Sequence, residues 1–291
     1  MPAFYERDFR VRYDECDAYG HVNHANYLRY MQETAFDASA VVGYDFATYR
    51  DMNRFWFVRE TEISFLRPLA YGDTVTVKTW VADFRRVRSR RMYELCLKGS
   101  GETVATASTD WVFLNSTDLR PATIPPQMVG AFIPEGQSST RSKREPFPKQ
   151  PAPPPGVYRS RRRVKWRDID GAHHVNNAVY LTYLEDCAIE FVRSEGWSVE
   201  RMMRAGFGII ARSFRIEYKQ PALIDDELEI ATWVSDVKRV TAVRHYTIRR
   251  AADEKLLVRA RALWVWVDLA TGRPIRIPVD FLADLSANIV R

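Results

Sequence analysis

The chain contains one segment twice. When the 291-residue sequence is compared with itself at an offset of 153 residues, residues 11–125 align with residues 164–278 without a gap, and about 30 of the aligned positions are identical. The densest shared stretch runs from His21 to Tyr30 in the first copy and from His174 to Tyr183 in the second. A gapless match of this length predicts two copies of one domain within the chain.

A proline-rich segment separates the two copies. Residues 134–156 contain seven prolines among Ser, Gln, Lys and Arg, and such a composition cannot form a core of its own. We therefore expect a first domain at residues 1–133, a semi-rigid linker at 134–156 and a second domain at 157–291. The charges of the linker are expected to be solvated, and a connection of roughly 30 residues spans about 30 Å, enough to cross one domain.

Each copy has one helix-forming stretch. Apolar side chains recur there every three or four residues, and Gly43 follows the first stretch where a helix C-terminus is expected. Asn23 and Asn176 precede the two stretches and fit the N-cap position. The apolar positions are Tyr27, Leu28, Met31, Ala35, Ala38 and Val42 in the first copy and Tyr180, Leu184, Ala188 and Phe191, followed by Gly196, in the second.

Strand-like segments surround the first helix. The stretch from Val75 to Thr79 alternates apolar and polar residues with period two, and the turns between segments are polar or contain glycine. One long helix beside a meander of four or five antiparallel strands predicts an α+β unit, in which the helix covers one face of the sheet. The expected strands are residues 6–13, 55–67, 73–84, 86–98 and 102–115.

Composition excludes several classes of protein. Apolar residues make up 46%, which supports a core and excludes global disorder. The net charge is +6, but residues 134–165 carry nine Lys or Arg against two Asp or Glu, so the basic charge is local and does not indicate a nucleic-acid-binding surface. Three scattered cysteines are too few for a disulfide framework, the N-terminus has no signal-like apolar region, and no apolar run approaches the ~18–20 residues of a membrane span. We expect a cytoplasmic protein that binds neither nucleic acid nor membrane.

Both copies place an acid, a short loop with a glycine and a histidine directly before the helix. In the first copy the acid is Asp17 and the histidine is His21; in the second they are Asp170 and His174. Backbone N–H groups at a helix start attract negative charge, and a carboxylate beside them can attack a carbonyl or activate a water. This arrangement suits thioester hydrolysis, because the N–H groups can hold the oxyanion.

Several runs of residues resemble the hotdog-fold thioesterases. The run from Cys16-Asp17 through Gly20-His21-Val22 to Tyr27 resembles the 4-hydroxybenzoyl-CoA thioesterase-like branch of that family. The run Asp170 to Asn177 is similar to the acyl-ACP thioesterases of plants and bacteria, which carry two hotdog domains in one chain. The resemblance implies a tandem hotdog, each copy a long helix wrapped by an antiparallel sheet of about five strands. Further matches are Leu66-Arg67-Pro68 with Gly72-Asp73, and Val265-Trp266-Val267-Asp268 with Gly272-Arg273-Pro274.

The resemblance also implies roles for these residues. Asp17 and Asp170 take the catalytic acid position, and the two histidines take the adjoining helix-entry position. The acyl-ACP enzymes place an asparagine two residues after their aspartate, where this chain has Tyr19 and Ala172, so we expect the aspartate-centred mechanism of the CoA branch. Hotdog active sites form across a pair of domains, so each copy would complete the site of the other, and one copy or both can be active. Residues expected to bind substrate are Gly20, Val22, Asn23, Val175, Asn176, Arg59 and Arg212.

Structural roles compete with these assignments. A loop aspartate is often a turn or helix-capping residue, and the two histidines could simply pack at the helix entry. Arg59 and Arg212 occupy matching strand positions, where they could bind CoA phosphates or form structural ion pairs. Cys16 is expected to be structural, because the second copy has isoleucine there. The adjacent His173 and His174 lack a third ligand at usable spacing, so no metal is expected.

The leading interpretation is an acyl-thioester hydrolase of fatty acid metabolism that needs no cofactor, with acyl-CoA favoured over acyl-ACP as substrate. One alternative is a non-catalytic hotdog module that binds acyl thioesters. Another is an enoyl-thioester hydratase or dehydratase, although the Asp-x-Asn-Pro-x-His and His-x-x-x-x-Pro patterns of those enzymes do not occur near these loops. Exposed sheet edges also favour a homodimer of the two-domain chain.

Overall fold

The chain forms two compact units of the same construction. The computed structural model describes residues 4–133 and 144–290. The units are Met1–Pro146 and Phe147–Arg291, and each has one long helix and a sheet of five antiparallel strands. The expected α+β class is therefore confirmed in both. The boundaries expected for the domains and the linker stay a prediction, and residues 134–143 of that linker lie outside the described residues.

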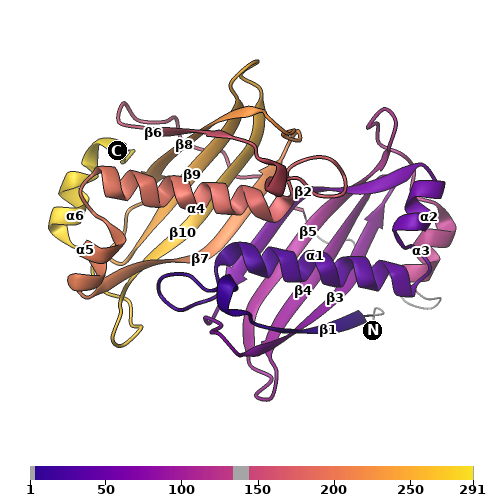
Figure 1. Ribbon diagram of the computed structural model, residues 1–291, viewed down its shortest axis with the longest axis horizontal. Helices are drawn as coiled ribbons and strands as arrows, with labels where there is room; N and C mark the ends of the chain where they lie inside the picture. Colours follow the sequence, from indigo (N-terminus) through magenta and orange to yellow (C-terminus); the bar gives the residue numbers. More distant parts are fainter. Residues whose placement is uncertain (1–3, 134–143, 291) are drawn as a thin grey trace. The chain divides into compact units, whose positions relative to one another are not determined.

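The sheet of unit 1 is built from long, directly paired strands. They are β1 (Phe4–Arg10), β2 (Arg54–Phe65), β3 (Thr74–Arg85), β4 (Arg88–Leu97) and β5 (Thr103–Asn115). Their order across the sheet is β1-β3-β4-β5-β2, and every neighbouring pair is antiparallel. Helix α1 (His24–Val41) lies across one face of this sheet (Figure 1). Val75 and Val77 on β3 are fully buried, as the period-two alternation predicts.

The expected simple meander is wrong for two of the five strands. β3, β4 and β5 pair in chain order, but β2 pairs with β5 and β1 pairs with β3. After the helix the chain forms β2 beside β5, and the loop at residues 66–73 then carries it past β5 and β4 to β3. Alternation within a strand shows which face is buried, but it carries no information about which distant strand becomes the neighbour.

Unit 2 repeats this arrangement. Its strands are β6 (Tyr158–Arg163), β7 (Phe207–Tyr218), β8 (Glu227–Ser235), β9 (Thr241–Arg250) and β10 (Leu256–Asp268). They follow the order β7-β10-β9-β8-β6, which is the order of unit 1 read from the opposite edge. Helix α4 (Asn177–Ser194) covers one face (Figure 1). The repeat in the sequence is therefore a repeat of topology as well.

The two long helices begin and end where the sequence predicts. Each has 18 residues, and the side chains of Asn23 and Asn176 each accept a 3.0 Å hydrogen bond from the N–H two residues further on, so both expected N-caps are confirmed. Gly43 and Gly196 follow the helices with φ of +88° and +84°, a backbone conformation that favours glycine after a helix. The capping residues thus fix the point at which each helix starts, directly after the candidate catalytic loop.

Several short elements escaped the sequence prediction. They are α2 (Phe46–Asp51), α3 (Pro126–Phe132), α5 (Val199–Arg204), α6 (Val279–Asp284) and the 3₁₀ turns η1 (Tyr13–Glu15), η2 (Trp166–Asp168) and η3 (Ser286–Asn288). Segments of fewer than two helical turns are too short to show helical periodicity. They complete the core all the same: Phe281 of α6 packs against the rings of Trp197, Phe207 and Trp266.

The described part of the proline-rich segment is attached to the folded units. Arg144 is 10% exposed and lies 2.5 Å from the fully buried Asp83 carboxylate and 3.0 Å from that of Asp110. The expectation that the charges of this segment are solvated is therefore wrong for Arg144. Phe147, three residues later, is buried, and the guanidinium groups of Arg215 and Arg259 lie over its ring. The sequence missed these contacts because their partners lie on distant strands.

Candidate active site

In unit 1 a tight turn precedes the long helix and carries the expected acid. The N–H of Asp17 donates to the carbonyl of His21 at 2.7 Å, which closes the turn. The Asp17 Oδ1 atom accepts hydrogen bonds from the N–H groups of Tyr19 at 2.8 Å and of His21 at 3.2 Å. Gly20 has a φ of +77°, which a residue with a Cβ adopts only under strain. The backbone therefore holds one oxygen of the carboxylate in place.

In unit 2 the same turn forms with different side chains. The N–H of Asp170 donates to the carbonyl of His174 at 3.1 Å, and Asp170 Oδ1 accepts from the N–H of Ala172 at 2.9 Å. The other oxygen, Oδ2, accepts from the amide side chain of Asn176 at 3.1 Å. His173 takes the place of Gly20 and has a φ of +63°, so this copy tolerates a side chain in a left-handed conformation. Both oxygens of Asp170 are thus held.

A second loop lies beside each turn and fixes its last residue. The N–H of Val22 donates to the carbonyl of Leu69 at 2.8 Å, and the N–H of Val175 donates to the carbonyl of Ala222 at 3.0 Å. The N–H groups of these same two acceptor residues donate in turn to tyrosine hydroxyls of α1 and α4, at 3.2 Å to Tyr27 and 2.8 Å to Tyr180. Burial raises the pKa of both tyrosines, so both hydroxyls stay protonated. Turn, second loop and helix form one hydrogen-bonded frame in each unit.

A second carboxylate, two residues before the first, connects each turn to the long helix. The hydroxyl of Tyr30 donates to Glu15 Oε2 at 2.6 Å, and that of Tyr183 donates to Asp168 Oδ2 at 2.7 Å. The same carboxylates accept the N–H groups of Arg12 and Lys165, the residues directly before η1 and η2, at 2.7 and 2.8 Å. Sequence reasoning considered Asp168 only as a possible metal ligand and did not predict these contacts. The available signal was an acid at position 15 and again at 168, matched to a tyrosine at 30 and again at 183.

The two helix-entry histidines lie in their turns as expected. His174 Nδ1 is 3.8 Å from Asp170 Oδ1, and the ring is largely buried. Burial lowers the pKa of His174, an effect that Asp170 opposes and His173 reinforces, so the imidazole is neutral at neutral pH. His21 is half-buried and pairs through its backbone with Ala70. A neutral imidazole beside the carboxylate can donate or accept a hydrogen bond without adding charge.

The N-terminus of α4 offers a backbone donor. Ala178 donates to the Asn176 cap and Val179 to the Asn176 carbonyl, whereas the N–H of Asn177 meets no acceptor in the described residues. A donor without a partner at the positive end of an 18-residue helix suits an oxygen that becomes negative during a reaction. The carboxylate of Asp170 and this donor therefore belong to one short stretch of chain, which is the combination that acyl transfer requires.

The remaining expected residues lie in different settings. Arg59 in β2 and Arg212 in β7 each occupy the extra residue of a β-bulge, opposite β5 and β10 respectively. Their role in binding CoA phosphates stays a prediction. Burial raises the pKa of Cys187 to about 11 and also raises that of Cys16, so both thiols are protonated and poor nucleophiles. Among residues 4–133 and 144–290, no three His, Cys, Asp or Glu side chains gather as a metal site would require.

Comparisons with known proteins follow the same division of the chain. Residues 2–132 match the model of the acyl-ACP thioesterase N-terminal domain, and residues 164–285 match that of the thioesterase-like superfamily. An acyl-CoA thioester hydrolase of Escherichia coli, YbgC, is 30% identical over 122 residues, which are 42% of this chain and 90% of that protein. The chain belongs to the hotdog-fold thioesterase family.

Two further similarities cover nearly the whole chain. The chloroplastic palmitoyl-acyl carrier protein thioesterase of Arabidopsis thaliana is 26% identical over 278 residues, or 89% of this chain. The chain spans 63% of the length of that relative. The solved structure of a 12:0-ACP thioesterase from Umbellularia californica superposes with a TM-score of 0.72 at 20% identity, covering 90% of this chain and 93% of that one. The expected tandem hotdog fold is thereby confirmed. Within the described residues, no helix is both long and apolar enough to cross a membrane.

Proposed function

We propose that this chain hydrolyses acyl thioesters to a carboxylic acid and a free thiol. The observation that carries the proposal is the repeated placement of an aspartate, held by backbone N–H groups, at the start of an 18-residue helix. Asp17 and Asp170 are the proposed catalytic carboxylates, and His21 and His174 adjoin them. The curated relatives named as thioester hydrolases support the same reaction.

The proposed chemistry follows from the geometry of the turn. As the thioester carbonyl is attacked, its oxygen gains negative charge, and the positive end of the helix stabilises that charge. Asp170 either attacks the carbonyl carbon itself, giving an anhydride that water then opens, or removes a proton from the attacking water. In both routes water supplies the oxygen of the acid, and the carrier leaves as a thiol. The hydrogen bonds to both Asp170 oxygens fix its direction before substrate arrives.

The proposed substrates are thioesters of CoA or of acyl carrier protein, and the proposed pathway is fatty acid metabolism. The E. coli relative supports CoA, whereas the plant relative, which matches both copies, supports the carrier protein. Asn23, Asn176, Val22, Val175 and Gly20 are proposed to line the substrate entrance, because they form the turn and the helix start. The three cysteines are all free, which supports a reducing compartment such as the cytoplasm. A homodimer of chains stays a prediction.

The test is thiol release from a panel of short, long, branched and aryl acyl-CoAs and from acyl-ACP. Asp170→Asn keeps the size of the side chain but removes its basicity, so we expect a fall in rate of about 100- to 10,000-fold if that copy is active. Asp17→Asn and the double variant show whether one copy or both carry the activity. Asp14→Asn is the matched control, because this exposed acid lies just before the turn and should leave the rate unchanged. Saturable acyl-CoA binding with no thiol release by the wild type would instead identify a binding module.

A further inference from the structure

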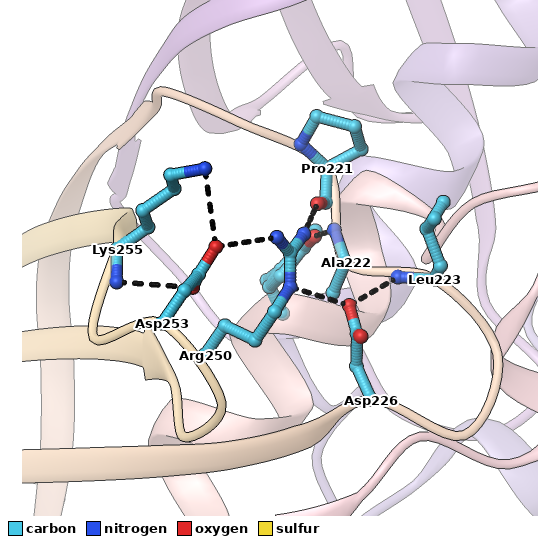
Figure 2. Close-up of polar contacts among 8 residues, drawn as sticks. Pro221, Ala222, Leu223, Asp226, Arg250, Asp253 and Lys255 are labelled. Atoms are coloured by element: carbon cyan, nitrogen blue, oxygen red, sulfur yellow. Dashed lines mark hydrogen bonds and ion pairs between the residues drawn. The ribbon is translucent and has the colours of Figure 1, made fainter.

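Unit 2 contains an arginine clamp that unit 1 lacks. Arg250, the last residue of β9, uses all three of its guanidinium nitrogens: Nη2 donates to the carbonyl of Pro221 at 3.0 Å, Nε to Asp226 Oδ2 at 3.0 Å and Nη1 to Asp253 Oδ2 at 3.2 Å. Figure 2 shows the guanidinium between the two carboxylates, with the Pro221 carbonyl on its third side. Burial opposes its charge, but the two carboxylates outweigh burial and raise the pKa of Arg250.

The clamp holds the loop at residues 219–226, which we call the supporting loop. Asp226 Oδ2 also accepts the N–H of Leu223 at 2.9 Å, so the loop is closed on itself around the arginine (Figure 2). The side chains of Arg250 and Asp226 are only 19% and 20% exposed, so solvent weakens their contact little. Arg250 therefore fixes the supporting loop at two points, through the Pro221 carbonyl and through the Asp226 carboxylate.

The supporting loop in turn holds the Asp170 turn. Ala222 follows Pro221 directly, and its carbonyl accepts the N–H of Val175 at 3.0 Å. Val175 pairs across the turn with Ile169, next to Asp170. A displacement of the Pro221–Ala222 backbone would therefore move the catalytic carboxylate relative to the helix start. Misplacement by about 1 Å can lower a reaction rate by about 100-fold.

Unit 1 shows that the loop folds without the clamp. Leu97 stands at the position equivalent to Arg250, yet Val22 still donates to the Leu69 carbonyl at 2.8 Å. Asp73, the equivalent of Asp226, still accepts the N–H of Ala70 at 2.8 Å. The hydrogen bonds that define the loop are present in both units, whereas the arginine is present in unit 2 alone. The arginine therefore restrains the loop further, but the loop does not need it in order to fold.

We infer that Arg250 is a positioning residue for Asp170, holding the catalytic turn of unit 2 through the supporting loop. The inference rests on the proposed thioester hydrolysis. Arg250 does not touch the reacting atoms in this assignment; it restricts the motion of the backbone that carries them. The restraint acts on the copy whose aspartate already has both oxygens hydrogen-bonded.

The test replaces Arg250 with the residue of the other copy. Arg250→Leu should fold, because Leu97 supports the same loop in unit 1, and we expect kcat for the best acyl-CoA of the panel to fall about 10- to 100-fold with little change in KM. Added guanidinium chloride at low millimolar concentration should restore part of the rate in this variant alone. Asp253→Asn is the matched control: it removes a partner of Arg250 in the β9–β10 turn that does not touch the supporting loop, and its kcat should match the wild type.

A second readout is amide hydrogen exchange at Val175. We expect this amide to exchange at least about 10-fold faster in Arg250→Leu, while the amide of Val22, its equivalent in unit 1, is unchanged. A variant with wild-type kcat, or with unchanged exchange at Val175, overturns the inference. A wild type that releases no thiol from any thioester overturns the proposed function instead, and the exchange at Val175 then still shows whether Arg250 holds the turn.

Discussion

Replacing Arg144 tests whether the segment between the two repeats is part of the fold. Arg144→Met keeps much of the aliphatic length but removes the guanidinium from the Asp83 and Asp110 carboxylates, which lie 2.5 and 3.0 Å away. Asp110 retains its two-pronged contact with Arg90, at 2.7 and 2.8 Å. Asp83, whose side chain is fully buried, loses its 2.5 Å ion pair with Arg144.

Removing one partner of a buried ion pair costs roughly 3–5 kcal/mol, because the remaining charge has already lost its water. We expect the free energy of unfolding of unit 1 to fall by about 3 kcal/mol, near the low end of that range, since Arg144 itself keeps slight exposure. Urea unfolding followed by circular dichroism measures this, with two transitions allowed for the two units. Arg144→Met combined with Asp83→Asn should recover much of the loss.

The outcome that would refute this reasoning is a loss below about 0.5 kcal/mol, the range of an exposed surface substitution. Lys149→Met is the control, because Lys149 is exposed in the same segment and should fall within that range.

Three further predictions concern single residues. Gly20→Ala should lower the free energy of unfolding by roughly 1 kcal/mol, measured by urea unfolding, because the new Cβ meets no atom within 4 Å and only the φ of +77° opposes it. Tyr183→Phe should lower it by about 1.5–3 kcal/mol by removing a hydroxyl bond to the Asp168 carboxylate, and Tyr30→Phe should match it; a loss in only one of the two would contradict the equivalence of the units. Burial lowers the pKa of His245 from 6.5 to about 4, so the unfolded chain binds this proton first as the pH falls. Stability should therefore decrease between pH 6.5 and about 4, and His245→Gln should flatten that slope in unfolding curves taken across the range.

The local parts of this fold could be predicted from the sequence, and the long-range parts could not. Asn23 and Gly43 mark the ends of α1 because capping depends on residues next to each other in the chain. The pairing of β2 with β5 depends on where the helix delivers the chain, and no residue within β2 records it.

The candidate site divides in the same way. The acid and the histidine of each turn stand in one short run and were identified from it. Tyr180, Ala222 and Arg250, which hold the turn of unit 2, come from three separate parts of the chain. Each is an ordinary residue for its own element, so only the folded structure shows that they act on the same turn.

Carrying both copies in one gene changes how such a site can vary. In an assembly of identical single-domain subunits, every substitution enters all sites at once, and a change that harms one harms the rest. Here His173 stands where the other copy has Gly20, and Arg250 where it has Leu97. One turn carries a bulky residue and an arginine clamp, and the other carries neither. Fusion thus allows a substitution to enter one half of the chain without entering the other.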